Sequence, residues 1–125
     1  MAHEPGVNEE RVICASADLQ DGGKGVRFTV DWHGQPAAAF VIRHQGTPHA
    51  FLNQCGHVPV ELDWQEGEFF DGDGVYLICA THGALYSPQD GHCITGRCSG
   101  KGLTSLPVEE RDNRICLTEH RLANT

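Results

Sequence analysis

The sequence has 125 residues, with 17 acidic and 9 basic side chains and a formal net charge of −8. A chain this acidic binds nucleic acid and anionic membrane surfaces poorly, so we expect neither as a partner. Hydrophobic residues make up 39% of the chain, which is enough for the core of one domain and argues against disorder. No apolar run approaches the roughly 20 residues that a membrane-spanning helix needs.

Short strands separated by turns are the predicted secondary structure. Residues 26–32 alternate apolar and polar side chains with a period of two, which is typical of a half-buried strand. No stretch of ten residues has a helical period with caps, so the sequence predicts an all-β fold, an antiparallel sandwich or barrel. Further strands are expected at residues 11–16, 37–43, 48–53 as a hairpin partner, 75–80, and 103–108 paired with 114–118 in a last hairpin.

The N-terminal residues lack the basic and apolar regions of a secretory signal, so we expect a cytoplasmic protein. In that compartment cysteines are more often reduced, metal-bound or buried than paired. We therefore expect Cys14 and Cys116, in the first and last predicted strands, to be small buried side chains. For Cys93 and Cys98, a disulfide between the two is the alternative to two reduced thiols.

Charge divides the chain into two parts. Residues 44–96 hold seven acidic and no basic side chains (−7), and the rest, with nine basic and ten acidic side chains, carries −1. This predicts one domain over residues 1–125, with a base from residues 11–43 and 97–118 and an acidic lobe at about 44–96. In another interpretation, compatible with the first, the acids between positions 61 and 73 form a single solvated loop.

Two short Cys–His motifs lie in the acidic segment. Cys55 and His57 have the spacing C-x-H, and Cys79 and His82 the spacing C-x-x-H. Zinc could accept these two thiolates and two imidazoles tetrahedrally, although C-x-H is an atypical zinc spacing. A mixed-ligand [2Fe–2S] cluster, with two Cys on one iron and two His on the other, fits the motifs better.

These motifs and the residues that follow them up to Tyr86 resemble the Rieske [2Fe–2S] family, most closely its soluble ferredoxin branch. The resemblance covers nearly the whole chain. It implies a Rieske-like antiparallel β-sandwich base with a small inserted cluster-binding β subdomain. It also implies that Cys55 and Cys79 bind the inner iron, that His57 and His82 bind the outer iron, and that Tyr86 donates a hydrogen bond to a ligand sulfur.

Three positions depart from the respiratory branch of that family. Val60 and Thr81 stand where that branch has two cysteines joined in a disulfide. Ala84 stands where that branch has a serine that hydrogen-bonds a bridging sulfide. Fewer hydrogen bonds to sulfur stabilise the reduced, more negative cluster less, so we expect a low reduction potential.

The resemblance implies a one-electron carrier that links a flavin reductase to an oxygenase or another terminal oxidoreductase. Substrate chemistry is not expected, because these 125 residues leave no room for a second domain with a 2-His-1-carboxylate iron site or a nucleotide fold. One alternative is a small or regulatory subunit of a larger oxidoreductase, similar to the small subunit of nitrite reductase. A zinc-binding interaction module is the third hypothesis.

Overall fold

The structure of the chain is a computed structural model that describes residues 11–54, 62–63, 67–71, 74–79, 83–95 and 102–118. Within these ranges no helix is long and apolar enough to cross a membrane. The regular elements are strands and one short 3-10 helix, as the sequence predicts: β1 (Arg11–Ala15), η1 (Ser16–Asp18), β2 (Val26–Trp32), β3 (Gln35–His44), β4 (Thr47–Leu52), β5 (Leu77–Ile78), β6 (Leu85–Tyr86), β7 (Cys93–Thr95), β8 (Ser105–Leu106), β9 (Val108–Arg111) and β10 (Arg114–Leu117).

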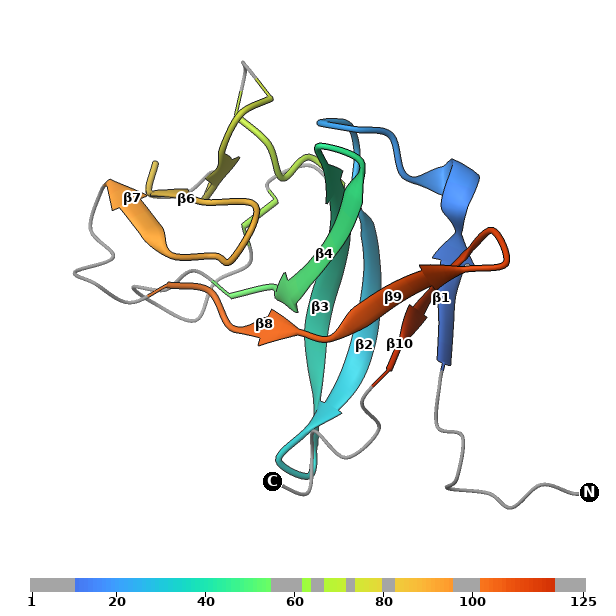
Figure 1. Cartoon of the computed structure of the whole chain (residues 1–125). Coiled ribbons are helices and arrows are strands. Elements are labelled where there is room, and N and C mark those ends of the chain that lie inside the picture. The colour runs from blue at the N-terminus through green and yellow to red at the C-terminus, as the bar shows by residue number, and fades with distance from the viewer. Residues whose placement is uncertain are drawn as a thin grey trace, which may run out of the picture.

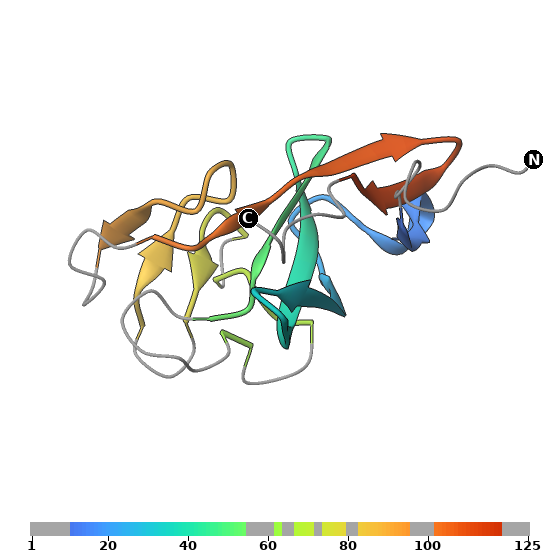
Figure 2. The same cartoon turned by 90° about the horizontal axis from the view of Figure 1, so that it is seen from below.

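The strands form three antiparallel sheets. The four-stranded sheet β2-β3-β4-β8 lies in the middle, with β1-β10-β9 on one side and β5-β6-β7 on the other (Figure 1). The view from below shows the same order (Figure 2). The middle sheet and β1-β10-β9 enclose one apolar core and form the sandwich base, and β5-β6-β7 is the small added subdomain. The predicted fold class is confirmed.

The central strand β3 is buried on both faces. Ala39 and Val41 point into the core shared with β1-β10-β9, and Phe40 and Ile42 point into the core under β5-β6-β7. Successive side chains of a strand point to opposite faces. A continuous apolar run therefore fills both cores, which explains why the strand predicted at 37–43 lacks polar alternation.

The hairpin turns of the base fit their sequences. Two successive residues with positive φ match the type I′ turns that suit the twist of antiparallel strands. Each of the three turns has such a pair: His33 and Gly34 (53° and 83°), Gln45 and Gly46 (52° and 81°), and Asp112 and Asn113 (54° and 62°).

The last predicted hairpin begins later than expected. The predicted strand 103–108 is divided at Pro107, because proline has no backbone N–H to donate a hydrogen bond to a neighbouring strand. On its N-terminal side β8 pairs with β4, and on its C-terminal side β9 pairs with β10. The same stretch of chain thereby joins the central sheet to the outer sheet of the base.

The division into base and lobe stays a proposal, with one boundary adjusted. β4 pairs with β3 and β8 in the central sheet, although the expected lobe begins near residue 44. We therefore propose that the lobe begins at Asn53, directly after β4. Its expected end, near residue 96, lies outside the described residues.

Arg43, near the end of β3, joins three parts of the base. Its guanidinium donates two hydrogen bonds of 2.9 Å to the carboxylate of Glu110 on β9. It also donates to the carbonyls of Leu19, Ser16 and Gly46 at 3.0, 3.1 and 3.1 Å. Such planar, bidentate pairs are the strong form of ion pair. The guanidinium lowers the pKa of Glu110 from 4.5 to about 2.

Glu110→Gln is expected to lower the free energy of unfolding by about 1–2 kcal/mol at pH 7, because one charged hydrogen-bond partner is lost. Since the pKa of Glu110 is lower in the folded state, its contribution is present above about pH 4.5 and lost as the pH falls toward 2. The difference between wild type and variant, measured by urea unfolding, should therefore shrink as the pH falls from about 4.5 toward about 2, the interval between the two pKa values. A difference that stays constant over this interval contradicts the assignment.

Candidate metal centre

The second Cys–His motif begins in a tight turn between β5 and β6. The N–H of Cys79 donates to the carbonyl of Ala84 at 2.9 Å, and the N–H of Gly83 donates to the carbonyl of Cys79 at 2.7 Å. Gly83 has φ +74°, a conformation that glycine adopts without steric cost. These bonds fix both ends of the segment that carries His82, which itself lies outside the described residues.

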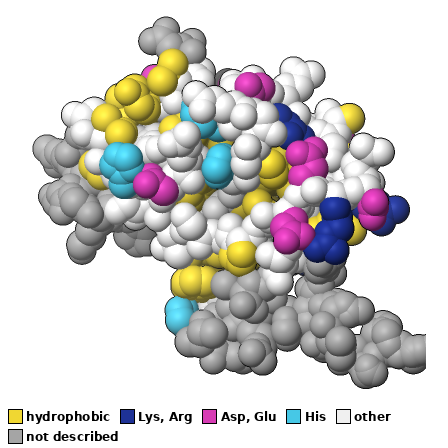
Figure 3. Space-filling model, viewed as in Figure 1, with side chains coloured by type: hydrophobic (Ala, Val, Ile, Leu, Met, Phe, Trp, Pro, Cys, Tyr) yellow, Lys and Arg dark blue, Asp and Glu magenta, His cyan; other side chains and the backbone are white. Residues whose placement is uncertain are grey.

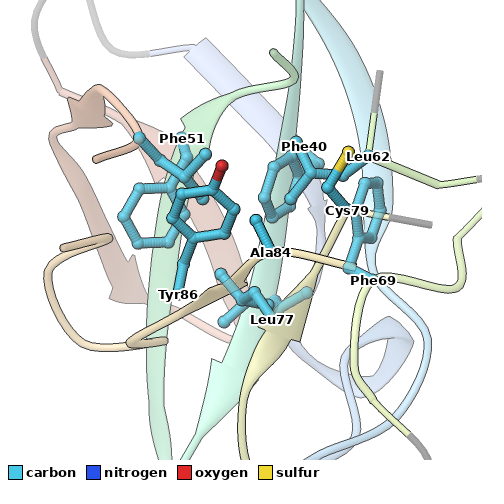
Figure 4. Packing of buried hydrophobic residues seen from close by; sticks show 10 residues of the cluster. Phe40, Phe51, Leu62, Phe69, Leu77, Cys79, Ala84 and Tyr86 are labelled. Carbon is cyan, nitrogen blue, oxygen red and sulfur yellow. The ribbon is translucent and has the colours of Figure 1, made fainter. Parts of the chain in front are cut away.

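The side chain of Cys79 is fully buried in an apolar cluster. Its neighbours in this cluster include Phe40, Leu62, Phe69 and Leu77 (Figure 4). An ionised thiolate in such surroundings requires a metal or hydrogen-bond donors, because burial alone disfavours the charge. A buried sulfur at the start of this turn therefore fits a ligand of an iron–sulfur cluster.

Tyr86 and Ala84 belong to the same cluster as Cys79. All three are 0% exposed. Figure 4 shows the Tyr86 hydroxyl and the Cys79 sulfur pointing toward the same side of the cluster. A buried tyrosine hydroxyl is normally placed to hydrogen-bond, whereas the methyl group at position 84 offers no donor. Tyr86 is thus a suitable donor toward a group held beside Cys79.

The structure describes one of the four predicted ligands, Cys79. Cys55, His57 and His82 lie outside the described residues. Within the described part of the chain, no group of three or more His, Cys, Asp or Glu side chains could hold a metal ion. The four-ligand set therefore stays a prediction, supported on the structure by the setting of Cys79.

The remaining cysteines differ in state. Cys116 is buried, as predicted, and Cys14 is half-buried against the base core. Burial, with Asp18 nearby, raises the pKa of Cys14 to about 11, so it is a neutral thiol at pH 7. Neither takes part in a disulfide. Cys93 is disulfide-bonded, and Cys98, the partner that the sequence suggests, lies outside the described residues.

The acids of the lobe are only partly solvated. Glu68 is exposed, but Asp63 is 8% exposed, and the carboxylate of Asp71 accepts hydrogen bonds from the N–H groups of Val75 and Tyr76 at 3.0 and 3.3 Å. The interpretation of positions 61–73 as one solvated loop is therefore wrong at Asp63. On the face shown in Figure 3, Lys and Arg side chains gather toward the base.

The comparisons with known proteins decide the family. Residues 9–109 match the Rieske [2Fe-2S] domain. The chain belongs to the Rieske family. The cofactor of this Rieske domain is accordingly a [2Fe–2S] cluster, and the buried sulfur of Cys79 fits that cofactor. Among curated proteins, no relative matches the sequence.

Solved structures of ferredoxins are similar to this chain in fold. The ferredoxin of Sphingomonas yanoikuyae B1 is similar at a TM-score of 0.69 and 21% identity, over 89% of this chain and 99% of that one. The ferredoxin of carbazole 1,9a-dioxygenase from Nocardioides aromaticivorans IC177 is similar at a TM-score of 0.68 and 19% identity, over 87% of this chain and 96% of that one. A complex of reduced oxygenase and oxidized ferredoxin in carbazole 1,9a-dioxygenase is similar at a TM-score of 0.67 and 22% identity, over 87% of this chain and 92% of the matched chain. This chain therefore has the fold of Rieske-type ferredoxins.

Proposed function

We propose that this Rieske domain is a one-electron carrier that receives electrons from a flavin reductase and passes them to an oxygenase or another terminal oxidoreductase. The observation that carries the proposal is the extent of the structural match. The similarity spans 99% of the Sphingomonas ferredoxin and 96% of the ferredoxin of the Nocardioides carbazole 1,9a-dioxygenase. The similar ferredoxin in complex with an oxygenase supports an oxygenase as the partner.

We propose Cys55 and Cys79 as thiolate ligands, His57 and His82 as imidazole ligands, and Tyr86 as a hydrogen-bond donor to a ligand sulfur. A bound [2Fe–2S] cluster supplies one-electron oxidation and reduction. The chain's own residues hold the ligands in place. The turn that begins at Cys79 is closed by two backbone hydrogen bonds, which supports a ligand position defined before the cofactor binds.

The aromatic core provides a rigid, dry wall beside the proposed ligand Cys79. Phe40 and Phe69 stack with their ring centroids 3.9 Å apart and their planes 10° apart, and Phe40 lies 5.7 Å from Phe51 by centroids. Close-packed side chains of this kind exclude water and do not rearrange easily. A site that changes little between two redox states suits electron transfer.

Hydrogen bonds to sulfur should set the reduction potential. Ala84→Ser adds a hydroxyl beside Cys79 and is expected to raise the potential, whereas Tyr86→Phe removes a hydroxyl and is expected to lower it. Each change is worth about 40 mV, because one hydrogen bond contributes about 1 kcal/mol and 59 mV corresponds to about 1.4 kcal/mol for one electron.

Protein-film voltammetry checks both variants, with Ser87→Ala as the control. The Ser87 hydroxyl accepts a hydrogen bond from the N–H of Gln89, and its loss should leave the potential unchanged. The low-potential proposal fails if the wild-type potential is that of a respiratory Rieske centre. Equal shifts in all three variants would contradict the proposed roles of Ala84 and Tyr86.

Electron transfer to a partner tests the function itself. The dithionite-reduced protein, mixed in a stopped-flow instrument with a terminal oxygenase of a dioxygenase system, should lose one electron per chain. The rate should fall as ionic strength rises, because residues 44–96 carry seven acidic and no basic side chains and would dock on a basic face. A rate that ignores ionic strength contradicts this docking, and stable co-purification with a large catalytic subunit favours the subunit hypothesis.

A further inference from the structure

The side chain of Asn53 joins the two ends of the segment that carries the first Cys–His motif. Asn53 follows β4 directly and is 1% exposed. Its Oδ1 accepts a hydrogen bond from the N–H of Leu62 at 2.8 Å, and its Nδ2 donates to Oδ1 of Asp63 at 3.1 Å. The segment between these ends, residues 54–61, contains Cys55 and His57.

The carboxylate of Asp63 completes the junction from the other end. Its side chain is 0% exposed, and its Oδ2 accepts a hydrogen bond from the N–H of Gly67 at 3.0 Å. The same oxygen lies 3.6 Å from Nε of Arg27 on β2. This buried charge therefore has two hydrogen-bond donors and a counter-ion, as a stable buried carboxylate requires.

The junction is fixed to the base on both sides. The backbone N–H of Asn53 donates to the carbonyl of Ala38 on β3 at 2.9 Å, which extends the β3–β4 ladder by one bond. The carbonyl of Gly67 accepts from the N–H of Gly25 at 2.9 Å, just before β2. The ends of the segment are thus held to two central strands and not only to each other.

A structural role alone explains this arrangement poorly. Apolar side chains of similar volume at a buried ionic site are often as stable as the ion pair or more stable. The hydrogen bonds of an amide and a carboxylate are directional, so the Asn53 and Asp63 side chains specify one distance between the two ends of the segment. Fixing the ends also lowers the entropy that the segment loses when it closes around a ligand. Metal ligands must be held within about 0.5 Å of their working geometry.

We propose that Asn53 and Asp63 are positioning residues for the first ligand motif, and that they act by fixing the ends of the segment through their side-chain pair. Arg27 supplies the counter-charge from the base. This inference rests on the proposed assignment of Cys55 and His57 as ligands.

Three sets of variants separate this role from general stability. Asn53→Asp keeps the acceptor for the Leu62 N–H but replaces the donor with a second carboxylate facing Asp63. Asp63→Asn is isosteric and removes the buried charge. In the exchanged pair, Asn53→Asp combined with Asp63→Asn, an amide at position 63 can donate to a carboxylate at position 53 and still accept from Gly67. Every hydrogen bond of the junction is then restored with the roles reversed.

The readouts are the rate of iron release into excess chelator and the EPR spectrum of the reduced holoprotein. We expect each single variant to release iron about tenfold faster than wild type, the scale seen when groups that orient a metal ligand are lost. The EPR lines should broaden, because the ligand geometry becomes less uniform. The exchanged pair should return to within about threefold of wild type.

Ile115→Val is the matched control, because Ile115 is 0% exposed in the base core and belongs to a different cluster from Cys79. It should lower stability without changing iron release or the EPR spectrum. The inference is overturned if the single variants release iron no faster than this control, or if the exchanged pair is as fast as the singles. Cys55→Ser tests the ligand assignment separately. If this variant keeps its cluster, the proposed ligands are contradicted. If it loses the cluster while the Asn53 and Asp63 variants release iron at the wild-type rate, only the present inference is contradicted.

Discussion

Cys79→Ala is expected to abolish cluster binding, with iron and sulfide below about one-tenth of the wild-type content. The thiolate of Cys79 is the proposed inner-iron ligand that the structure describes, 0% exposed at the start of a turn closed by two backbone hydrogen bonds. The other buried members of the apolar cluster are hydrocarbon side chains and one tyrosine, and Cys93, which packs against them, is disulfide-bonded, so none of them offers a thiolate in place of Cys79. Metal analysis and the visible spectrum of the purified protein measure the loss.

Cys116→Ala is the matched control for this experiment. Cys116 is also buried, at 4% exposure, and takes part in no disulfide, but it lies on β10 in the base. Removing its sulfur should cost about 1 kcal/mol of stability and leave the cluster content unchanged. A Cys79→Ala protein with a full complement of iron and sulfide would show that Cys79 is a core residue and not a ligand.

Gly25→Ala is expected to lower the free energy of unfolding by about 3 kcal/mol. Gly25 precedes β2 at the point where the lobe meets the central sheet. A Cβ atom there would lie 2.7 Å from Cγ2 of Ile42, 2.8 Å from Cδ2 of Phe69 and 2.8 Å from the carbonyl oxygen of Val41. These contacts are too short for carbon atoms, and the backbone oxygen and the packed aromatic ring can yield only if the core shifts.

Gly34→Asn is the control for the glycine prediction. Nothing lies within 4 Å of a Cβ at Gly34, and asparagine tolerates the φ of +83° found there better than most residues. We expect it to cost less than about 1 kcal/mol. Urea unfolding of the two holoproteins, monitored by circular dichroism, compares them at one pH. Equal destabilisation by the two variants would contradict the packing described around Gly25.

The base could be predicted from sequence because its strands are long enough to show a pattern. Residues 26–32 alternate over seven positions, and β2 occupies the same seven. The turn at His33 and Gly34 also follows from local residue types. In contrast, β6 has two residues and β7 has three, so neither can show a period, and both strands were missed. Their pairing depends on the core that they cover.

Contacts between residues far apart in the sequence were also beyond prediction. Asp63 belongs to an acidic, apparently solvated stretch, and its burial depends on partners 10 positions earlier, at Asn53, and on another strand, at Arg27. Arg43 is similar, because its bond to Glu110 spans 67 positions. The family itself was identified by a resemblance that the two Cys–His motifs and the residues up to Tyr86 carry, and such motifs can be recognised in the sequence because they are local. The roles of Asn53 and Asp63 follow only from the fold.

The most direct test of this account is an EPR and ENDOR measurement on the dithionite-reduced protein, prepared with 15N-labelled histidine. The proposed ligand set predicts one unpaired spin per two irons, coupled to nitrogen from the side chains of His57 and His82. A reduced cluster without coupling to histidine nitrogen would contradict the mixed ligand set, and a protein that binds zinc with no paramagnetic signal would contradict the electron-transfer function.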